Sequence, residues 1–257
     1  MTPNRPLLEV KNLKKHFPIR GGLLGRTTAK VYAVDGVSFD IAKGETLSLV
    51  GESGCGKSTV GKALLRLYPV TDGEVYLDGQ RIDNMPAGKL RPIRQRMQVV
   101  FQDPFSSLNP RMKIIDILGE PLSDFGMAKN RADLREKVSL LMDKVRLPRD
   151  AIDRFPHEFS GGQRQRIGIA RALALNPSLV VLDEPVSALV VSIQGAVVNL
   201  LDDLQDQLGL CYLFTSHDLS LVRHISNVIA VIYFRMLFQH GTAETFVTHP
   251  CSQVTPS

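Results

Sequence analysis

Residues 51–59, Gly51-Glu52-Ser53-Gly54-Cys55-Gly56-Lys57-Ser58-Thr59, decide the fold. They match the pattern GxxxxGK[ST], in which glycines let successive backbone N–H groups point at phosphate oxygens. A helix that begins here adds its positive N-terminal end, and Lys57 adds a full charge for the β- and γ-phosphates. The Ser58 hydroxyl is suited to coordinate Mg²⁺. The alternative is a chance glycine-rich turn, which a strand before the loop and a helix after it make a poor explanation.

Strand-like and helix-like segments alternate around this loop, which predicts an α/β domain. From about Lys113 to Ala174 the pattern becomes helical, and a second helical stripe starts at Ile193. The Asp78-Gly79 pair predicts a tight hairpin turn. Strands are expected at 7–13, 37–41, 46–50, 74–77, 97–101, 179–182, 211–215 and 228–233.

The composition favours a folded, cytosolic chain. Hydrophobic residues make up 44% and charged residues 22%, values that are ordinary for a globular protein. No apolar run reaches the roughly 18 residues of a membrane-spanning helix, and the N-terminus lacks the apolar core of a secretory signal. The three cysteines have no metal-binding spacing, which indicates a reducing compartment.

The net charge of +5 is modest, and its densest basic stretch runs from Lys89 to Lys113. No aromatic residues are interleaved with these charges, so we interpret the stretch as a solvated face rather than a nucleic-acid site. No nucleic-acid partner is therefore expected.

An apolar strand runs into two acids in Leu179-Val180-Val181-Leu182-Asp183-Glu184-Pro185. At the carboxyl end of a strand beside the phosphate loop, Asp183 is suited to hold the metal. Glu184 is suited to polarise an attacking water. The alternative is a strand that ends in solvated acids, and only the presence of the phosphate loop favours the functional interpretation.

Two further polar residues each follow a predicted strand. His217 ends the strand at 211–215 and could contact the γ-phosphate, although a lone histidine is usually structural. Gln102 follows the strand at 97–101, where it could sense metal or water.

A second anion-binding helix start is predicted at Ser160-Gly161-Gly162-Gln163. Ser160 is a good N-cap, and the glycines expose N–H groups at the start of the helix. Because the chain has only one nucleotide loop, this helix start would bind the γ-phosphate of a nucleotide held by another subunit. The alternative is a helix that is merely well capped.

The order and spacing of five segments resemble those of the nucleotide-binding subunit of ABC transporters over almost the whole chain. These segments are GESGCGKST, FQDP, FSGGQRQR, LVVLDEP and TSHD. Two longer stretches are similar to the oligopeptide and dipeptide importer branch: FQDPFSSLNPRMKI and KVYAVDGVSFDIAKGETLSLVGESGCGKST. Nickel importers belong to the same branch and have similar sequences. The resemblance implies a P-loop NTPase core of the ABC type with a mixed sheet and an N-terminal antiparallel β portion. Residues 7–101 and 176–247 would form the core of a single domain, 102–175 an inserted helical subdomain that carries the signature, and 248–257 a short tail.

The resemblance also implies roles for matching positions. Residues 51–59 would bind the phosphates of ATP, and Phe17 would stack on the adenine. Ser58, Gln102 and Asp183 would surround Mg²⁺. Glu184 would act as the general base, and His217 as the switch histidine. Residues 160–163 would close over the ATP of the partner.

The partners follow from the same resemblance. They would be a second ATPase subunit, usually a different chain, two integral membrane permeases, and indirectly a substrate-binding protein. The chain would sit peripherally on the cytoplasmic face of the bacterial inner membrane, and residues just after Gln102 would receive a coupling helix of the permease. ATP-driven closure of the dimer would then energise import of peptides.

The sequence departs from the family at several late positions. Val190 occupies the place of the D-loop aspartate, and Phe159 that of a leucine. Arg235 replaces a turn glycine, where a positive φ would resist arginine, and the chain stops soon after His249. We therefore keep a catalytically impaired subunit as an alternative. A soluble ABC ATPase outside transport is less well supported, because neither a second cassette nor a long coiled coil is visible.

Overall fold

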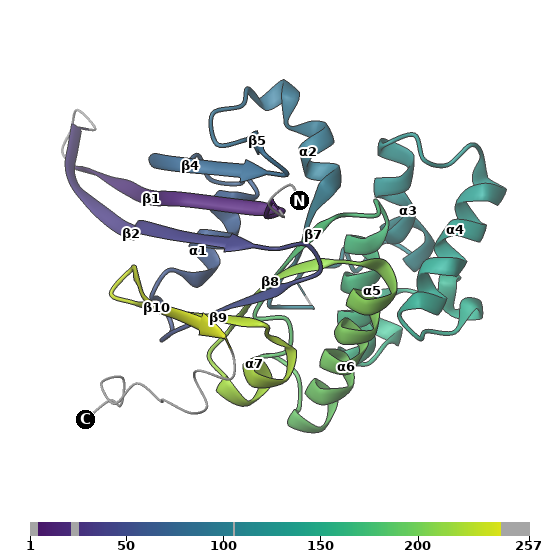
Figure 1. The fold of residues 1–257 in the computed structure, drawn as a ribbon. Helices are drawn as coiled ribbons and strands as arrows, with labels where there is room; N and C mark the ends of the chain where they lie inside the picture. The colour runs from purple at the N-terminus through teal and green to yellow at the C-terminus, as the bar shows by residue number, and fades with distance from the viewer. Residues whose placement is uncertain (1–4, 22–25, 105, 243–257) are drawn as a thin grey trace. The chain divides into compact units, whose positions relative to one another are not determined.

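The computed structural model describes residues 5–21, 26–104 and 106–242 (Figure 1). Within these residues the chain forms two compact units. The first takes the described parts of Met1–Leu90 and Cys211–Ser257, and the second takes those of Arg91–Leu210. The boundaries expected near residues 102 and 175 stay predictions, and the tail expected at 248–257 lies outside the described residues.

An antiparallel sheet opens the first unit. Its strand order is β2 (Arg26–Ile41), β1 (Leu8–Gly21), β4 (Asp72–Leu77) and β5 (Gln80–Arg81). Figure 1 shows β1 between β2 and β4, with Leu8 opposite both Ile41 and Leu77. This sheet is the expected N-terminal antiparallel β portion. Strands β1 and β2 extend well beyond the predicted segments 7–13 and 37–41.

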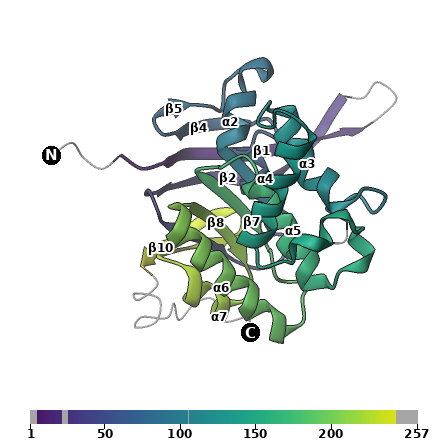
Figure 2. The ribbon, with the colours of Figure 1, turned by 90° about the vertical axis from the view of Figure 1, so that its right-hand side faces the viewer.

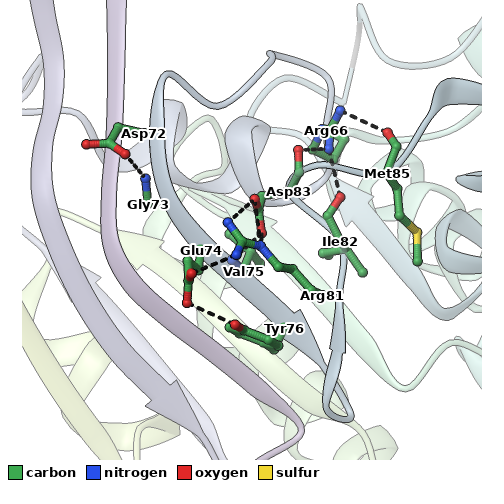
Figure 3. Close-up of polar contacts among 10 residues, drawn as sticks. All are labelled: Arg66, Asp72, Gly73, Glu74, Val75, Tyr76, Arg81, Ile82, Asp83 and Met85. Atoms are coloured by element: carbon green, nitrogen blue, oxygen red, sulfur yellow. Dashed lines mark hydrogen bonds and ion pairs between the residues drawn. The ribbon is translucent and has the colours of Figure 1, made fainter.

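The turn between β4 and β5 has the predicted tight geometry. Asp78 and Gly79 both have positive φ, 49° and 79°, as a type I′ turn requires. Just past β5, Asp83 accepts a hydrogen bond from the Val75 amide at 2.9 Å and pairs with Arg81 at 3.1 Å (Figure 3). The short hairpin is therefore held by side chains as well as by the backbone ladder.

A second arginine ties this hairpin to the chain that follows the first helix. Arg66 donates hydrogen bonds to the carbonyl groups of Ile82 at 2.7 Å, Asp83, and Met85 at 3.3 Å (Figure 3). Arg66 lies just after α1 (Lys57–Leu64), and its own φ of 55° is left-handed. The guanidinium thus fixes the C-terminal end of α1 against the antiparallel sheet.

A mainly parallel group of strands completes the first unit. β3 (Thr46–Val50) pairs in parallel with β8 (Cys211–Ser216) on one side and β9 (Val228–Tyr233) on the other. Every residue of β3 and β8 is buried, as expected for parallel strands covered on both faces. The helix α7 (Leu219–Ile225) connects β8 to β9.

The hairpin of β9 and β10 (Met236–Thr242) closes although arginine replaces the expected glycine. Tyr233 pairs with Met236, so Phe234 and Arg235 form a two-residue turn with φ of 46° and 72°. The turn does require positive φ, as predicted, but arginine does not prevent it. Two side chains in the left-handed region instead leave the turn strained.

The second unit contains two parallel strands and most of the helices. β6 (Met97–Val100) pairs with β7 (Leu179–Asp183), whose five residues are all buried. Figure 2 shows α3, α4 and α5 grouped together. Each of these helices carries a fully buried apolar residue, Leu118, Val138 and Ile167 respectively. The helices of this unit are α2 (Arg91–Arg96), α3 (Ile114–Asp124), α4 (Arg131–Lys144), α5 (Gly161–Leu173) and α6 (Val191–Leu208).

Short 3₁₀ turns lie at Ala87–Lys89, Arg149–Asp153 and Pro156–Glu158. Among the helices that the described residues form, none combines the length and the apolar character needed to span a bilayer.

Candidate nucleotide site

The loop at 51–56 lies between β3 and α1, as the motif requires. Two of its glycines leave no room for a side chain. A Cβ on Gly51 would lie 2.3 Å from the Ile232 carbonyl oxygen, and one on Gly56 would lie 2.4 Å from that of Ala33. Gly56 is also the N-cap of α1, with a φ of 112°. Packing and backbone conformation together therefore demand glycine here.

Lys57 folds back over this loop. Its side chain is buried, and Nζ donates hydrogen bonds to the carbonyl groups of Gly51 at 2.7 Å and Glu52 at 3.0 Å. No side chain caps the N-terminus of α1. The loop therefore offers phosphate two kinds of donor: the ammonium group of Lys57 and the backbone N–H groups at a helix start that has no side-chain cap. The residues present therefore fit the triphosphate of a nucleotide.

Phe17 lies on the β-ribbon that borders the loop. It pairs with Val31 in β2, two residues before Ala33, whose carbonyl abuts Gly56. The Phe17 ring is half-buried and meets the ring of Tyr68 edge-on, with centroids 5.3 Å apart. An aromatic ring beside a phosphate loop is suited to stack on a base.

In the second unit, Gln102 and Glu184 lie together although they are 82 residues apart. The Gln102 amide donates to the Glu184 carboxylate at 3.2 Å. Asp183, the last residue of β7, is buried, and Glu184 follows it with a left-handed φ of 47°. The Glu184 carbonyl accepts hydrogen bonds from the Ser187 amide at 3.3 Å and hydroxyl at 3.0 Å. This small turn holds a strained residue where a functional acid is predicted.

The predicted Mg²⁺ ligands have suitable chemistry. Mg²⁺ prefers hard oxygen ligands, together with phosphate oxygens and water. Such ligands are the Ser58 hydroxyl, the Gln102 amide oxygen and the Asp183 carboxylate. The described residues contain no group of three or more His, Cys, Asp or Glu side chains that could hold a metal by themselves. Because Ser58 belongs to the first unit and the other two residues to the second, the combined set stays a prediction.

His217 is exposed and lies between Ser216 and Asp218, two residues held by hydrogen bonds. Ser216, the last residue of β8, accepts a hydrogen bond from the Asp218 amide at 3.0 Å. Asp218 in turn caps α7 by accepting from the Ser220 amide at 2.8 Å. The backbone around His217 is therefore set by its neighbours, and its predicted role stays a prediction.

The predicted signature does begin a helix. Ser160 and Gln163 form a reciprocal capping box: the Gln163 amide donates to the Ser160 hydroxyl at 3.3 Å, and the Ser160 amide donates to the Gln163 side chain at 2.9 Å. Phe159, which the resemblance marks as a departure from leucine, is buried. Gly162 has a packing role that the sequence did not reveal, because a Cβ there would lie 2.5 Å from Ile193 Cγ2 of α6.

Val190 is the N-cap of α6. Its φ of −62° and ψ of 140° are those of an N-cap residue, but valine has no oxygen for the first-turn amides. The side chain is 69% exposed, and Val191 beside it is 80% exposed. An aspartate, which the resemblance implies at this position, would supply an N-cap that valine cannot.

A phosphate loop that follows a buried parallel strand and leads into a helix, with a lysine folded into it, defines a P-loop nucleotide-binding protein. Residues 34–187 match the model of the family described as ABC transporter. The chain therefore belongs to the ABC transporter family, as an ATP-binding cassette.

Relatives are similar over nearly the full chain. The oligopeptide transport ATP-binding protein AppF of Bacillus subtilis (strain 168) is 53% identical over 251 residues, which cover 96% of this chain and 76% of AppF. OppF of the same organism is 50% identical, with coverage of 98% and 80%. The glutathione import ATP-binding protein GsiA of Escherichia coli (strain K12) is 51% identical over 95% of this chain, which spans 39% of GsiA.

Solved structures agree with the fold. The dimeric post-hydrolysis structure of the ATP-binding cassette MJ0796, bound to ADP and Pi, has a TM-score of 0.81 and 27% identity. The structural match covers 92% of this chain and 98% of the MJ0796 chain. The mixed α/β fold and the family predicted from the sequence are thus confirmed.

Proposed function

We propose that this chain binds and hydrolyses ATP to drive the import of peptides through a membrane permease. The observation that carries the proposal is the phosphate loop, with Lys57 buried inside it and with Gly51 and Gly56 in positions that exclude a side chain. The names of the relatives support the cargo class, since AppF and OppF are oligopeptide transport proteins and GsiA is a glutathione import protein.

In this proposal the loop amides and Lys57 hold the β- and γ-phosphates, while Phe17 stacks on the adenine. Glu184, to which Gln102 donates a hydrogen bond, orients the attacking water and accepts its proton. His217 contacts the γ-phosphate. Bound Mg²⁺, held by Ser58, Gln102 and Asp183, would neutralise charge on the phosphate oxygens.

The assembly is part of the same proposal. A second cassette, usually a different chain, supplies its own signature to this chain's ATP, and residues 160–163 close over the partner's ATP. Two permeases bind the segment after Gln102 and hold the cassette at the cytoplasmic face of the bacterial inner membrane. A substrate-binding protein delivers the peptide to the permeases.

Reconstitution with the partner cassette and permeases in vesicles tests the proposal. Glu184→Gln should keep Mg-ATP binding and lower hydrolysis and peptide uptake by about 100-fold or more, the size of a general-base contribution. Asp206→Asn removes an exposed acid of α6 and serves as the control. Hydrolysis unchanged in Glu184→Gln would contradict the role of Glu184. ATP-dependent uptake of nickel in place of peptide would move the chain to the nickel branch. Failure to co-purify with any permease would favour a soluble ABC ATPase.

Val190 supports a second candidate function, a nucleotide-binding subunit with weakened hydrolysis. The observation behind it is the helix start of α6, which lacks a side-chain cap where the family has aspartate. Restoring the acid by Val190→Asp in the reconstituted complex should raise ATP turnover at least severalfold if this second candidate is correct. Unchanged turnover would rule this candidate out and leave the first.

A further inference from the structure

Lys15 is a buried lysine on β1 whose ammonium group faces an aromatic ring. Only 6% of the residue is exposed. Nζ donates a hydrogen bond to the Pro69 carbonyl at 2.8 Å and lies 4.7 Å from the centroid of the Phe17 ring. Burial lowers the pKa of Lys15 below its ordinary value. A cation is costly to bury, so its two contacts must offset a considerable loss of hydration.

These contacts join the strand that carries Phe17 to the far end of the helix that starts at the phosphate loop. Tyr68 and Pro69 follow α1, and the Tyr68 amide still donates to the Lys62 carbonyl of that helix at 3.3 Å. Tyr68 meets the Phe17 ring edge-on, while Pro69 accepts from Lys15. The Phe17 ring thus contacts the perpendicular ring of Tyr68 and has a cation over one face.

We propose that Lys15 is a positioning residue for the nucleotide base. The ammonium occupies one face of Phe17 and orients the ring, so that its other face receives the adenine. This inference rests on the proposed function, because it assumes that Phe17 stacks on the base. Lys15 itself does not touch the nucleotide; it lowers the entropic cost of ordering the ring when ATP binds.

Lys11 provides a matched control on the same strand. Its ammonium lies 5.1 Å from the ring centroid of Tyr76, so it makes the same type of contact. The Lys11 side chain is 53% exposed and pairs with Glu9 at 2.7 Å. Lys11→Met therefore removes a cation from an aromatic face of β1 without touching Phe17.

The test compares the affinities of the full chain for Mg-ATP and for Mg-tripolyphosphate, which has no base, by titration calorimetry. Lys15→Met keeps the length of the side chain and removes the cation. It should weaken Mg-ATP binding by about fivefold or more and leave tripolyphosphate binding within about twofold. Lys15→Arg, which keeps a cation and a donor, should recover most of the loss. Lys11→Met should change neither affinity.

The outcomes separate this inference from the proposed function. Equal weakening for both ligands, or none for either, would overturn the role of Lys15. Should Lys15→Met fail to fold, Lys15→Gln, which retains a donor for Pro69, decides the same question. Phe17→Ala should weaken only ATP, by about tenfold or more; if it does not, base stacking by Phe17 is wrong. Lys57→Ala should abolish binding of both ligands, and persistent binding would contradict the phosphate site itself.

Discussion

Replacing Val190 by aspartate is expected to raise the free energy of unfolding by about 1 kcal/mol. Val190 already has N-cap geometry, and its carbonyl accepts from the Ile193 amide at 2.8 Å. An aspartate oxygen would satisfy one more first-turn amide for about 1 kcal/mol, and its charge would add about 0.5 kcal/mol at the positive end of α6. Since the valine is 69% exposed, its loss costs at most about 0.5–1 kcal/mol.

Scanning calorimetry of the full chain measures this gain, which corresponds to a rise in Tm of about 3 °C for a protein of this size. Val191→Asp is the matched control. It places the same charge one residue further along, at an 80% exposed position inside the first turn, where a side chain cannot cap. We expect Val190→Asp to exceed this control by about 2 °C. Equal shifts would refute capping, and a lower Tm for Val190→Asp would refute the reasoning about α6.

Three further substitutions follow from the backbone and from packing. Arg235→Gly should raise the free energy of unfolding by about 1 kcal/mol in denaturant titrations, because glycine tolerates the φ of 72°; Arg235→Val should lower it. Asp218→Ala should cost about 1 kcal/mol by removing the cap that accepts from the Ser220 amide, whereas Asp218→Asn should restore most of it. Gly162→Ala should cost about 1–3 kcal/mol through its clash with Ile193, and Ile193→Ala in the same chain should recover part of that loss.

The parts of the fold that could be predicted are those with a local signal. β7 begins with four consecutive apolar residues, and β3 contains three in its five positions; the structure places them at Leu179–Asp183 and Thr46–Val50, within a residue of the prediction. Asp78-Gly79 specifies its own turn because both residues tolerate positive φ. The phosphate loop is equally local, since its pattern, its strand and its helix are consecutive in the sequence.

The parts that could not be predicted depend on residues far apart in the chain. β1 runs to Gly21 and β2 starts at Arg26, because the backbone groups of each strand are hydrogen-bonded by the other, and this pairing extends beyond the segments 7–13 and 37–41 expected from the sequence. Lys15 meets a carbonyl 54 residues away, and Gln102 meets an acid 82 residues away. Gly162 is required by a side chain on another helix. No periodicity of the sequence carries such information.

Two of the departures from the family, Val190 and Arg235, lie at exposed positions, whereas the third, Phe159, is buried. Val190 is 69% exposed and Arg235 lies exposed in the turn between β9 and β10, so these two changes cost a helix cap and backbone strain rather than core packing. Lys57 and the glycines of its loop are instead fixed by burial and by carbonyl groups too close for a Cβ. A cassette altered in this way should keep its nucleotide cradle while its exposed surfaces change. We therefore expect any loss of function to concern what the cassette does with a neighbouring subunit, not whether it binds ATP.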